Sequence, residues 1–282
     1  MANFSFAPFT GNGSPILPPL TKLVPGQYLR SPNQRFLMIL QPDGNLVIYD
    51  DPISKALWWA TEREPPYWLY ATPADDKAGG NYLTTSYYFR FNDVTRNRAW
   101  QSINSTPLGG DVNLAYFRTY LILQDDGNLV LNDTFPLWAS NTSIEAFSLF
   151  KTDMVIKPSE ALIQDKTYYS GANRVIFQSD GNLVIYGPGD AVLFQSRTQR
   201  ATQALMQEDG NFVILNGSTV LFQTNTGGNP GAYARIQSNG TFSIAIDKPV
   251  WARFGFTPTI TPRKKWTQWG PVNIPVWPFP SL

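Results

Sequence analysis

The sequence predicts an all-β fold that is assembled from small repeated sheets. A nine-residue phrase, Gln-x-Asp-Gly-Asn-Leu-Val-Ile-Tyr, occurs at residues 178–186 and again at 41–49, with less complete copies elsewhere. A large aromatic residue at the end of an apolar run follows most of these copies. No segment shows the 3.6-residue period of an amphipathic helix. Such internal repetition predicts several structurally equivalent units in one chain.

The nine-residue phrase predicts a β-hairpin. In the copy at 178–186, the apolar run Val175–Phe177 precedes an Asp-Gly-Asn turn, and residues 183–186 have the character of a return strand. Side chains alternate across a sheet, so Leu183 and Ile185 should face the core. The opposite face then gathers Gln178, Asp180, Asn182, Val184 and Tyr186 into a small polar pocket.

Four further copies repeat this hairpin with varying completeness. The copy at 41–49 keeps every pocket position, namely Gln41, Asp43, Asn45, Val47 and Tyr49. The copy with Gln207, Asp209, Asn211 and Val213 has Leu215 in place of Tyr, and the copy with Gln124, Asp126, Asn128 and Val130 has Asn132 there. The copy at 237–245 loses four of the five positions. The two intact copies are predicted binding pockets. The others are either weak or vestigial sites, or plain turn chemistry.

Six closing aromatics sort the repeats into two domains. They are Trp59, Trp100, Trp138, Phe194, Phe222 and Trp251. Their spacing gives two groups of three, and three sheets that each bury one face and one large aromatic predict a prism with threefold pseudosymmetry. We therefore expect a first domain at 1–150, including a lead-in and an insertion, and a second at 151–256. A Pro/Trp-rich extension at 257–282 follows.

Two stretches lie outside the repeat. Residues 64–89 are dense in Tyr and Trp, which suits a protein-contact surface, although an enlarged structural hairpin explains them equally well. The segment from residue 257 is too rich in proline for a helix or a central strand. We expect it to lie extended on the prism surface rather than to insert into a membrane.

Composition excludes several classes of function. The net charge is +1, so a nucleic-acid partner is not expected. The absence of Cys and His excludes disulfides, Cys or His metal sites and Ser-His-Asp catalysis. No paired acid and base lie outside the repeats, so we expect no enzyme. The N-terminus has no basic region and no continuous apolar core, so no secretory signal is expected, and no apolar run is long enough for a membrane helix.

The phrase Gln-x-Asp-x-Asn-x-Val-x-Tyr resembles the signature of monocot mannose-binding lectins, the snowdrop-agglutinin type, which have a β-prism II fold. The resemblance covers about residues 20–256 in two tandem copies, without the disulfide that plant members usually carry. The tandem arrangement and the C-terminal segment resemble, more narrowly, the lectin-like bacteriocins of the putidacin type, which pseudomonads and their relatives make.

This resemblance implies a role for each pocket residue. The Asp and Asn bind the axial 2-hydroxyl of mannose, which assigns that role to Asp43 and Asn45 and to Asp180 and Asn182. Gln reaches O3, Tyr donates to O4, and Val contacts the apolar patch of the sugar. None of the five contacts the 6-position, so 6-deoxymannose (D-rhamnose) should bind as readily as mannose. No metal or other cofactor is needed.

The resemblance also implies a biological activity. A bacteriocin of this type would bind lipopolysaccharide that contains D-rhamnose or mannose through its second domain and kill related Gram-negative bacteria without enzymatic activity. An outer-membrane barrel-assembly protein would be a further partner, and the first domain would set the strain range. We expect a monomer that is made in the cytoplasm, released extracellularly, and active at the target outer membrane. The alternative is a mannose-binding agglutinin or adhesin that does not kill.

Overall fold

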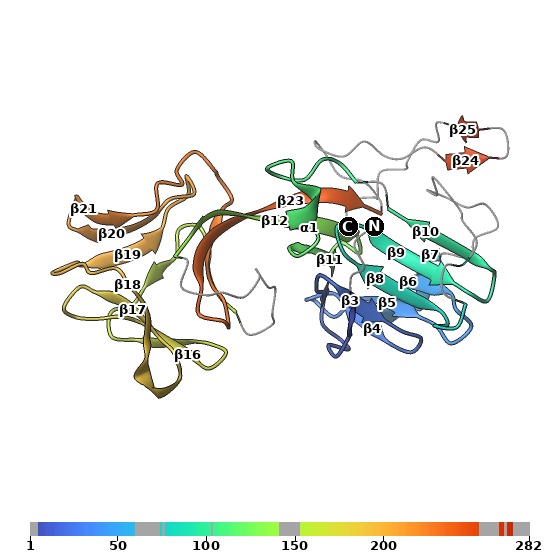
Figure 1. The fold of residues 1–282 in the computed structure, drawn as a ribbon, viewed down its shortest axis with the longest axis horizontal. Helices are drawn as coiled ribbons and strands as arrows, with labels where there is room; N and C mark the ends of the chain where they lie inside the picture. The colour runs from blue at the N-terminus through green and yellow to red at the C-terminus, as the bar shows by residue number, and fades with distance from the viewer. Residues whose placement is uncertain are drawn as a thin grey trace. The chain divides into compact units, whose positions relative to one another are not determined.

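A computed structural model describes residues 5–59, 74, 77–102, 104–140, 153–253, 265–267 and 270–272. These residues form short β-strands with one four-residue helix, α1 (Val112–Ala115), and two single-turn 3-10 helices, η1 (Asp51–Ile53) and η2 (Pro188–Asp190) (Figure 1). The all-β prediction is therefore confirmed. The chain divides into two compact units, which we call unit 1 (Met1–Asp133 and Lys248–Leu282) and unit 2 (Thr134–Asp247).

Unit 1 contains three groups of strands. The first is a four-stranded sheet of β4 (Tyr28–Arg30), β5 (Phe36–Leu40), β6 (Leu46–Asp50) and β7 (Lys55–Trp59). The second comprises β1 (Ala7–Pro8), β3 (Thr21–Leu23), β8 (Tyr82–Thr85), β9 (Phe89–Asp93) and β10 (Arg98–Gln101). The third includes β2 (Ile16–Leu17), β11 (Thr119–Leu123) and the start of β12 (Leu129–Ala139).

Unit 2 also contains three groups. One sheet comprises β15 (Thr167–Ser170), β16 (Asn173–Phe177), β17 (Leu183–Tyr186) and β18 (Val192–Gln195). Another comprises β14 (Ala161–Leu162), β19 (Gln203–Met206), β20 (Phe212–Asn216) and β21 (Thr219–Gln223). The third includes β13 (Met154–Ile156), β22 (Tyr233–Ile236) and the start of β23 (Phe242–Ala252). Three sheets around one core give each unit the threefold plan of a β-prism II domain.

The predicted hairpins form in the expected register. Strand β16 pairs antiparallel with β17, with Phe177 opposite Leu183 and Val175 opposite Ile185. Leu183 and Ile185 are fully buried in the core of unit 2, as the alternation predicts. Strands β5 and β6 repeat the arrangement in unit 1.

Three partly buried closing aromatics pack against the core of unit 2. The rings of Trp138, Phe194 and Phe222 meet edge to face, with centroid separations of 6.3, 6.1 and 6.2 Å for the three pairs. Each ring comes from a different sheet, so the contact reproduces the threefold pseudosymmetry at the level of single side chains. Edge-to-face packing is a favoured geometry for aromatic pairs at such distances.

Strands β12 and β23 are exchanged between the units, which corrects the expected domain boundaries. Trp138 on β12 lies in the core of unit 2, whereas Trp251 on β23 is 4% exposed in the core of unit 1, 5.3 Å from the Phe89 ring. Both strands are 11 residues long, and each passes from one unit into the other (Figure 1). The units therefore do not coincide with consecutive segments 1–150 and 151–256. The repeats place both aromatics in equivalent positions, so the sequence alone does not tell which core each one fills.

Polar contacts hold each exchanged strand in its new unit. In unit 2, Ser140 N donates to Phe242 O at 2.8 Å, and Thr134 Oγ1 and Tyr233 Oη both donate to Asp247 Oδ1. Burial and the Asp247 carboxylate raise the pKa of Tyr233, so its phenol stays protonated as a donor. In unit 1, Arg253 N donates to Leu129 O at 2.8 Å and Ser105 N to Val250 O at 2.9 Å.

The stretches outside the repeat are described in part. Within 64–89, Tyr87 is 3% exposed and Phe89 is fully buried, so these two aromatics belong to the core of unit 1 and not to a contact surface. Burial raises the pKa of Tyr87 to about 12. Within the C-terminal extension, β24 (Lys265–Thr267) and β25 (Gly270–Val272) pair antiparallel. The other residues of both stretches, and the predictions made for them, lie outside the described part of the chain. The side chains of Trp59 and Trp100 also lie outside it. The register pairs Trp58 with Ile48, as it pairs Phe194 with Ile185, so Trp58 and not the predicted Trp59 stands at the closing position of that sheet.

Among the described residues, no helix has the length and apolarity that crossing a membrane requires, and no cluster of three or more His, Cys, Asp or Glu side chains could hold a metal ion.

Candidate carbohydrate-binding site

The turn between β16 and β17 is held by a closed set of hydrogen bonds. Gln178 N donates to Asn182 O at 2.8 Å, and Gly181 N donates to Gln178 O at 2.9 Å. Asp180 Oδ1 accepts from Asn182 N at 2.8 Å. Gly181 has φ +92°, and a Cβ there would lie 2.1 Å from Ala201 N. Both the left-handed backbone and the close approach to Ala201 N require glycine at this position. The tight turn that Gly181 allows places the Asp180 carboxylate beside Asn182 N.

The far end of the pocket is a Gln–Tyr contact. Gln178 Nε2 donates to Tyr186 Oη at 3.1 Å. Because that oxygen accepts from Gln178, the phenolic hydrogen is available to a ligand. The guanidinium of Arg174 lies over the Tyr186 ring at 5.2 Å from its centroid, and Arg174 is also ion-paired with Asp190. The sheet register places Val184, which is 2% exposed, on the same face between Asn182 and Tyr186.

Asn182 is oriented by residues that the nine-residue phrase does not contain. Its Oδ1 accepts from Ser196 Oγ at 3.0 Å and from Arg197 N at 2.9 Å. These two bonds occupy the oxygen, so the amide nitrogen is the group left to face a ligand as a donor. Sequence reasoning missed this role of Ser196. The signal was present, because a Ser or Thr follows five of the six closing aromatics at the second position.

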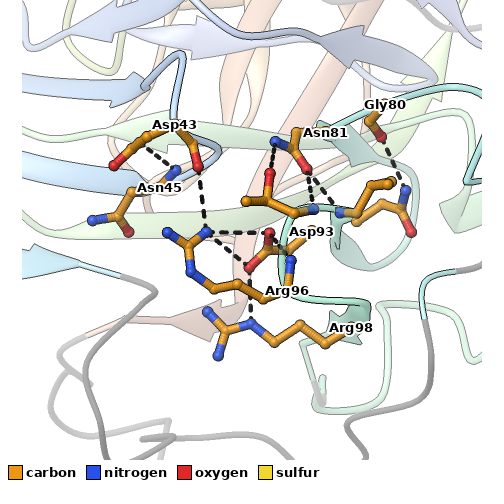
Figure 2. A network of polar contacts seen from close by, with 10 residues as sticks. Asp43, Asn45, Gly80, Asn81, Asp93, Arg96 and Arg98 are labelled. Carbon is orange, nitrogen blue, oxygen red and sulfur yellow. Dashed lines mark hydrogen bonds and ion pairs between the residues drawn. The ribbon is translucent and has the colours of Figure 1, made fainter.

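The intact copy in unit 1 reproduces this geometry. Gln41 Nε2 donates to Tyr49 Oη at 3.0 Å, and Asn45 N donates to Asp43 Oδ1 at 2.9 Å. Figure 2 shows the turn lying beside a polar network from the β8–β9 sheet. In that network, Arg96 Nη1 donates to Asp43 O at 3.5 Å and is ion-paired with the buried Asp93. The two intact sets of motif residues therefore lie in separate units with the same internal hydrogen bonds.

The copy at 207–215 keeps the hydrogen bonds of the Asp–Asn turn but lacks the tyrosine. Asn211 N donates to Asp209 Oδ1 at 2.9 Å, and Asn211 Oδ1 accepts from Thr224 Oγ1 at 3.1 Å. Leu215 stands where the intact copies have tyrosine, so this pocket lacks the phenol at its far end. Gln207 and Val213 occupy their expected places at the turn and on β20.

The copy at 124–132 is partly enclosed by protein, with Asp126 exposed and Asn128 buried. Asn128 N donates to Asp126 Oδ1 at 2.8 Å, and Gln124 closes the turn as in the other copies. Asn128 and Asn132 are however only 6% and 8% exposed, and Val130 is 1% exposed. Asn132 Nδ2 donates to Tyr120 Oη on the neighbouring strand at 3.1 Å. Burial of the central asparagine favours the structural interpretation of this copy.

The copy at 237–245 is a turn without a pocket. Asn239 Oδ1 accepts from Thr241 N at 3.1 Å and so takes the place that Asp has in the other turns. Gln237 is 1% exposed. The register places Tyr233, on the neighbouring strand, opposite Ala245, but its hydroxyl is bonded to Asp247. The structural role predicted for this copy fits these contacts.

The fold is a β-prism, and its hairpins carry Gln, Asp, Asn, Val and Tyr on one face. This combination of fold and site is that of a lectin. The chain is 33% identical over 105 residues to a mannose-specific lectin from Aloe arborescens, an alignment that covers 36% of this chain and 95% of that protein. No family model matches the sequence. Among solved structures, the two-domain fetuin-binding agglutinin of Scilla campanulata superposes with a TM-score of 0.54 at 19% identity, covering 85% of this chain and all of that one.

These comparisons supply the family. The chain belongs to the mannose-specific lectins of the monocot type, the B-lectin family. The Scilla structure shares the two-domain fold.

Proposed function

We propose that this protein is a lectin that binds D-mannose and D-rhamnose residues through the hairpins β5–β6 and β16–β17. One observation carries the proposal: the two hairpins, in separate units, form the same internal hydrogen bonds. The Gln–Tyr bonds measure 3.0 and 3.1 Å, and the Asn–Asp bonds 2.9 and 2.8 Å. The repetition of the same polar groups in the same geometry on two solvent-facing hairpins supports a ligand-binding role.

The pocket chemistry fits a hexose with an axial 2-hydroxyl. The Asp180 carboxylate accepts and the Asn182 amide donates, so one hydroxyl placed between them would satisfy both. An epimer that points this hydroxyl elsewhere leaves both groups unpaired, which costs affinity. Gln178 and Tyr186 would take the next two hydroxyls along the ring, and no motif residue is assigned to the 6-position. The site binds and does not catalyse.

We further propose that the lectin is a bacteriocin that kills related Gram-negative bacteria after binding their lipopolysaccharide. The support is the architecture of a single chain: two pockets in two units that exchange strands, followed by a C-terminal extension. Two sites on one chain that meet a repetitive polysaccharide gain residence through avidity. An outer-membrane barrel-assembly protein is proposed as the second partner, and residues 65–89 as the segment that meets it.

The rival function is a lectin that attaches or agglutinates without killing, and it predicts a different outcome of one experiment. Purified protein is spotted on lawns of assorted Gram-negative strains, beside the Asp43→Ala/Asp180→Ala double variant. The bacteriocin predicts clear zones on some strains, with a higher dose needed for the double variant. Growth under every spot, together with agglutination of mannose-bearing cells by the parent, would leave the adhesin as the function.

A second arm separates sugar binding from killing. Replacement of residues 65–89 by a short turn should abolish killing or shift its strain range while the affinity for methyl α-D-mannoside stays unchanged. Since Tyr87 and Phe89 are core residues, a version that retains residues 87–89 controls for loss of folding. Unaltered killing of the same strains by both versions would remove this segment from the lethal contact.

A further inference from the structure

We infer that Gln195 is a sixth ligand-contacting residue of the β16–β17 pocket, and that it donates to the sugar unit next to the one bound by the motif. The inference rests on the proposed function, because it extends that pocket across strand β18. The ligand it implies for this pocket is an α-linked oligosaccharide rather than a single sugar.

The position of Gln195 follows from the sheet. Strand β18 is the last strand of its sheet and pairs with β17, with Gln195 opposite Val184. Cross-strand partners share a face, so Gln195 lies on the pocket face beside the valine. Its side chain is exposed, and its Oε1 lies 3.5 Å from Asn182 Nδ2. Because the sheet ends at β18, a glycan that leaves the pocket on this side passes over Gln195.

A count of donors and acceptors shows what Gln195 can offer. Asn182 Oδ1 is filled by Ser196 and Arg197, and one of the two Nδ2 hydrogens is directed to Gln195 Oε1. The second hydrogen remains for the sugar in the pocket. The Gln195 side chain is exposed and its amide nitrogen has no hydrogen-bond partner among the described residues, so both of its hydrogens are available to a ligand. This is a donor held in place by Asn182 and directed at the next sugar.

The neighbouring repeat has the same contact between a glutamine and the motif asparagine, so this contact follows from the strand register. In the copy at 207–215, Gln223 lies opposite Val213, and Asn211 Nδ2 donates to Gln223 Oε1 at 3.3 Å. That copy lacks the tyrosine, so it supplies a matched control with the same glutamine but an incomplete pocket.

The two intact pockets differ at this position. Opposite Val47, the β5–β6 hairpin has Trp59 in the register that Gln195 occupies opposite Val184. The five motif residues are identical in both pockets, so any difference in oligosaccharide preference must come from residues around them. The cross-strand position is the nearest such difference, and it makes the two pockets unequal toward extended glycans.

The test uses the full chain with Asp43→Ala, which leaves the β16–β17 pocket as the intact site. Calorimetry compares methyl α-D-mannoside with a panel of α-linked mannobiosides that differ in linkage. We expect at least one mannobioside to bind about two- to tenfold more tightly than the monosaccharide, the range of one hydrogen bond. Gln195→Ala and Gln195→Glu should both remove that gain, the second because it keeps the oxygen and loses the donor. Monosaccharide affinity should fall less than mannobioside affinity in both variants.

Three results are diagnostic. Gln223→Ala should leave the mannobioside gain intact. A gain that survives both Gln195 variants, or that is absent from every mannobioside in the parent background, overturns the inference. An equal loss of monosaccharide and mannobioside affinity in Gln195→Ala also overturns it, because Gln195 would then merely position Asn182. If the Asp43→Ala chain binds no monosaccharide at all, the proposed function itself fails.

Discussion

At the scale of single residues, the site depends on amides and a carboxylate that are oriented by backbone N–H groups and by the Ser196 hydroxyl. Asp180 is held by Asn182 N, and Asn182 is held by Ser196 and Arg197 N. The five motif residues could be predicted from the sequence, because alternation along a strand is a local property. The repeated Ser or Thr after the closing aromatics was visible in the sequence, but its contact with Asn182 was not, because that contact depends on which strand pairs with β17 and in which register.

Asp180→Ala should weaken binding of methyl α-D-mannoside in the Asp43→Ala background. The carboxylate supplies a charge-assisted hydrogen bond worth about 1.5–3 kcal/mol, or roughly ten- to 150-fold in affinity. Asp180 is exposed, so the melting temperature should change little. Calorimetry and thermal melting check both points, with Asp209→Ala as the matched control in the pocket that lacks tyrosine. Unchanged affinity in the Asp180 variant would remove this residue from the site.

At the scale of elements, each hairpin combines a glycine turn with a strand whose core face is apolar, and both signals are local in sequence. That is why the hairpins at 41–49 and 178–186 could be placed correctly. The sequence could not show which motif asparagines the rest of the chain buries. Asn128 has the same neighbours along the chain as Asn182, yet it is 6% exposed. Burial there is decided by elements remote in sequence.

The sheet that carries the unit 1 pocket also carries a pH-sensitive ion pair. Arg35 Nε and Nη2 donate to Asp50 at 3.0 and 2.8 Å, and these bonds lower the pKa of Asp50. A lowered folded-state pKa stabilises the fold at pH values above the unfolded-chain value of about 4, and the contribution is lost as the pH falls through the folded-state value. The Asp50→Asn variant should therefore have a lower melting temperature than the parent, by a constant difference near neutral pH. The margin should shrink in acid. Equal margins at about pH 3 and about pH 7 would contradict the assignment.

At the scale of the whole molecule, the exchange of β12 and β23 makes each core depend on an aromatic from the other repeat. The repeats predicted Trp138 and Trp251 as closing aromatics, but not which core each one fills, because the two residues have equivalent local patterns. The connections around them, and not their own neighbours in sequence, decide which core each one fills. Among the described closing aromatics, Trp251 is buried in the core of unit 1, and Trp138, Phe194 and Phe222 are partly buried against the core of unit 2.

Trp251→Ala should destabilise unit 1 by about 3–5 kcal/mol, the usual cost of truncating a buried tryptophan. Hydrogen exchange should then speed up in β2, β9 and β11, while β16, β17 and β20 stay protected. Trp138→Ala is the reciprocal variant and should expose unit 2 instead. Loss of protection in β20 and β22 alone after Trp251→Ala would mean that the strands are not exchanged in solution.

Two intact pockets on one chain are the central claim, and their stoichiometry tests it most directly. Titration calorimetry with methyl α-D-mannoside is run on the parent, on Asp43→Ala, on Asp180→Ala and on the double variant, with melting curves to confirm folding. The account predicts two binding equivalents per chain in the parent, one in each single variant and none in the double variant. Binding that persists undiminished in a folded double variant would contradict it.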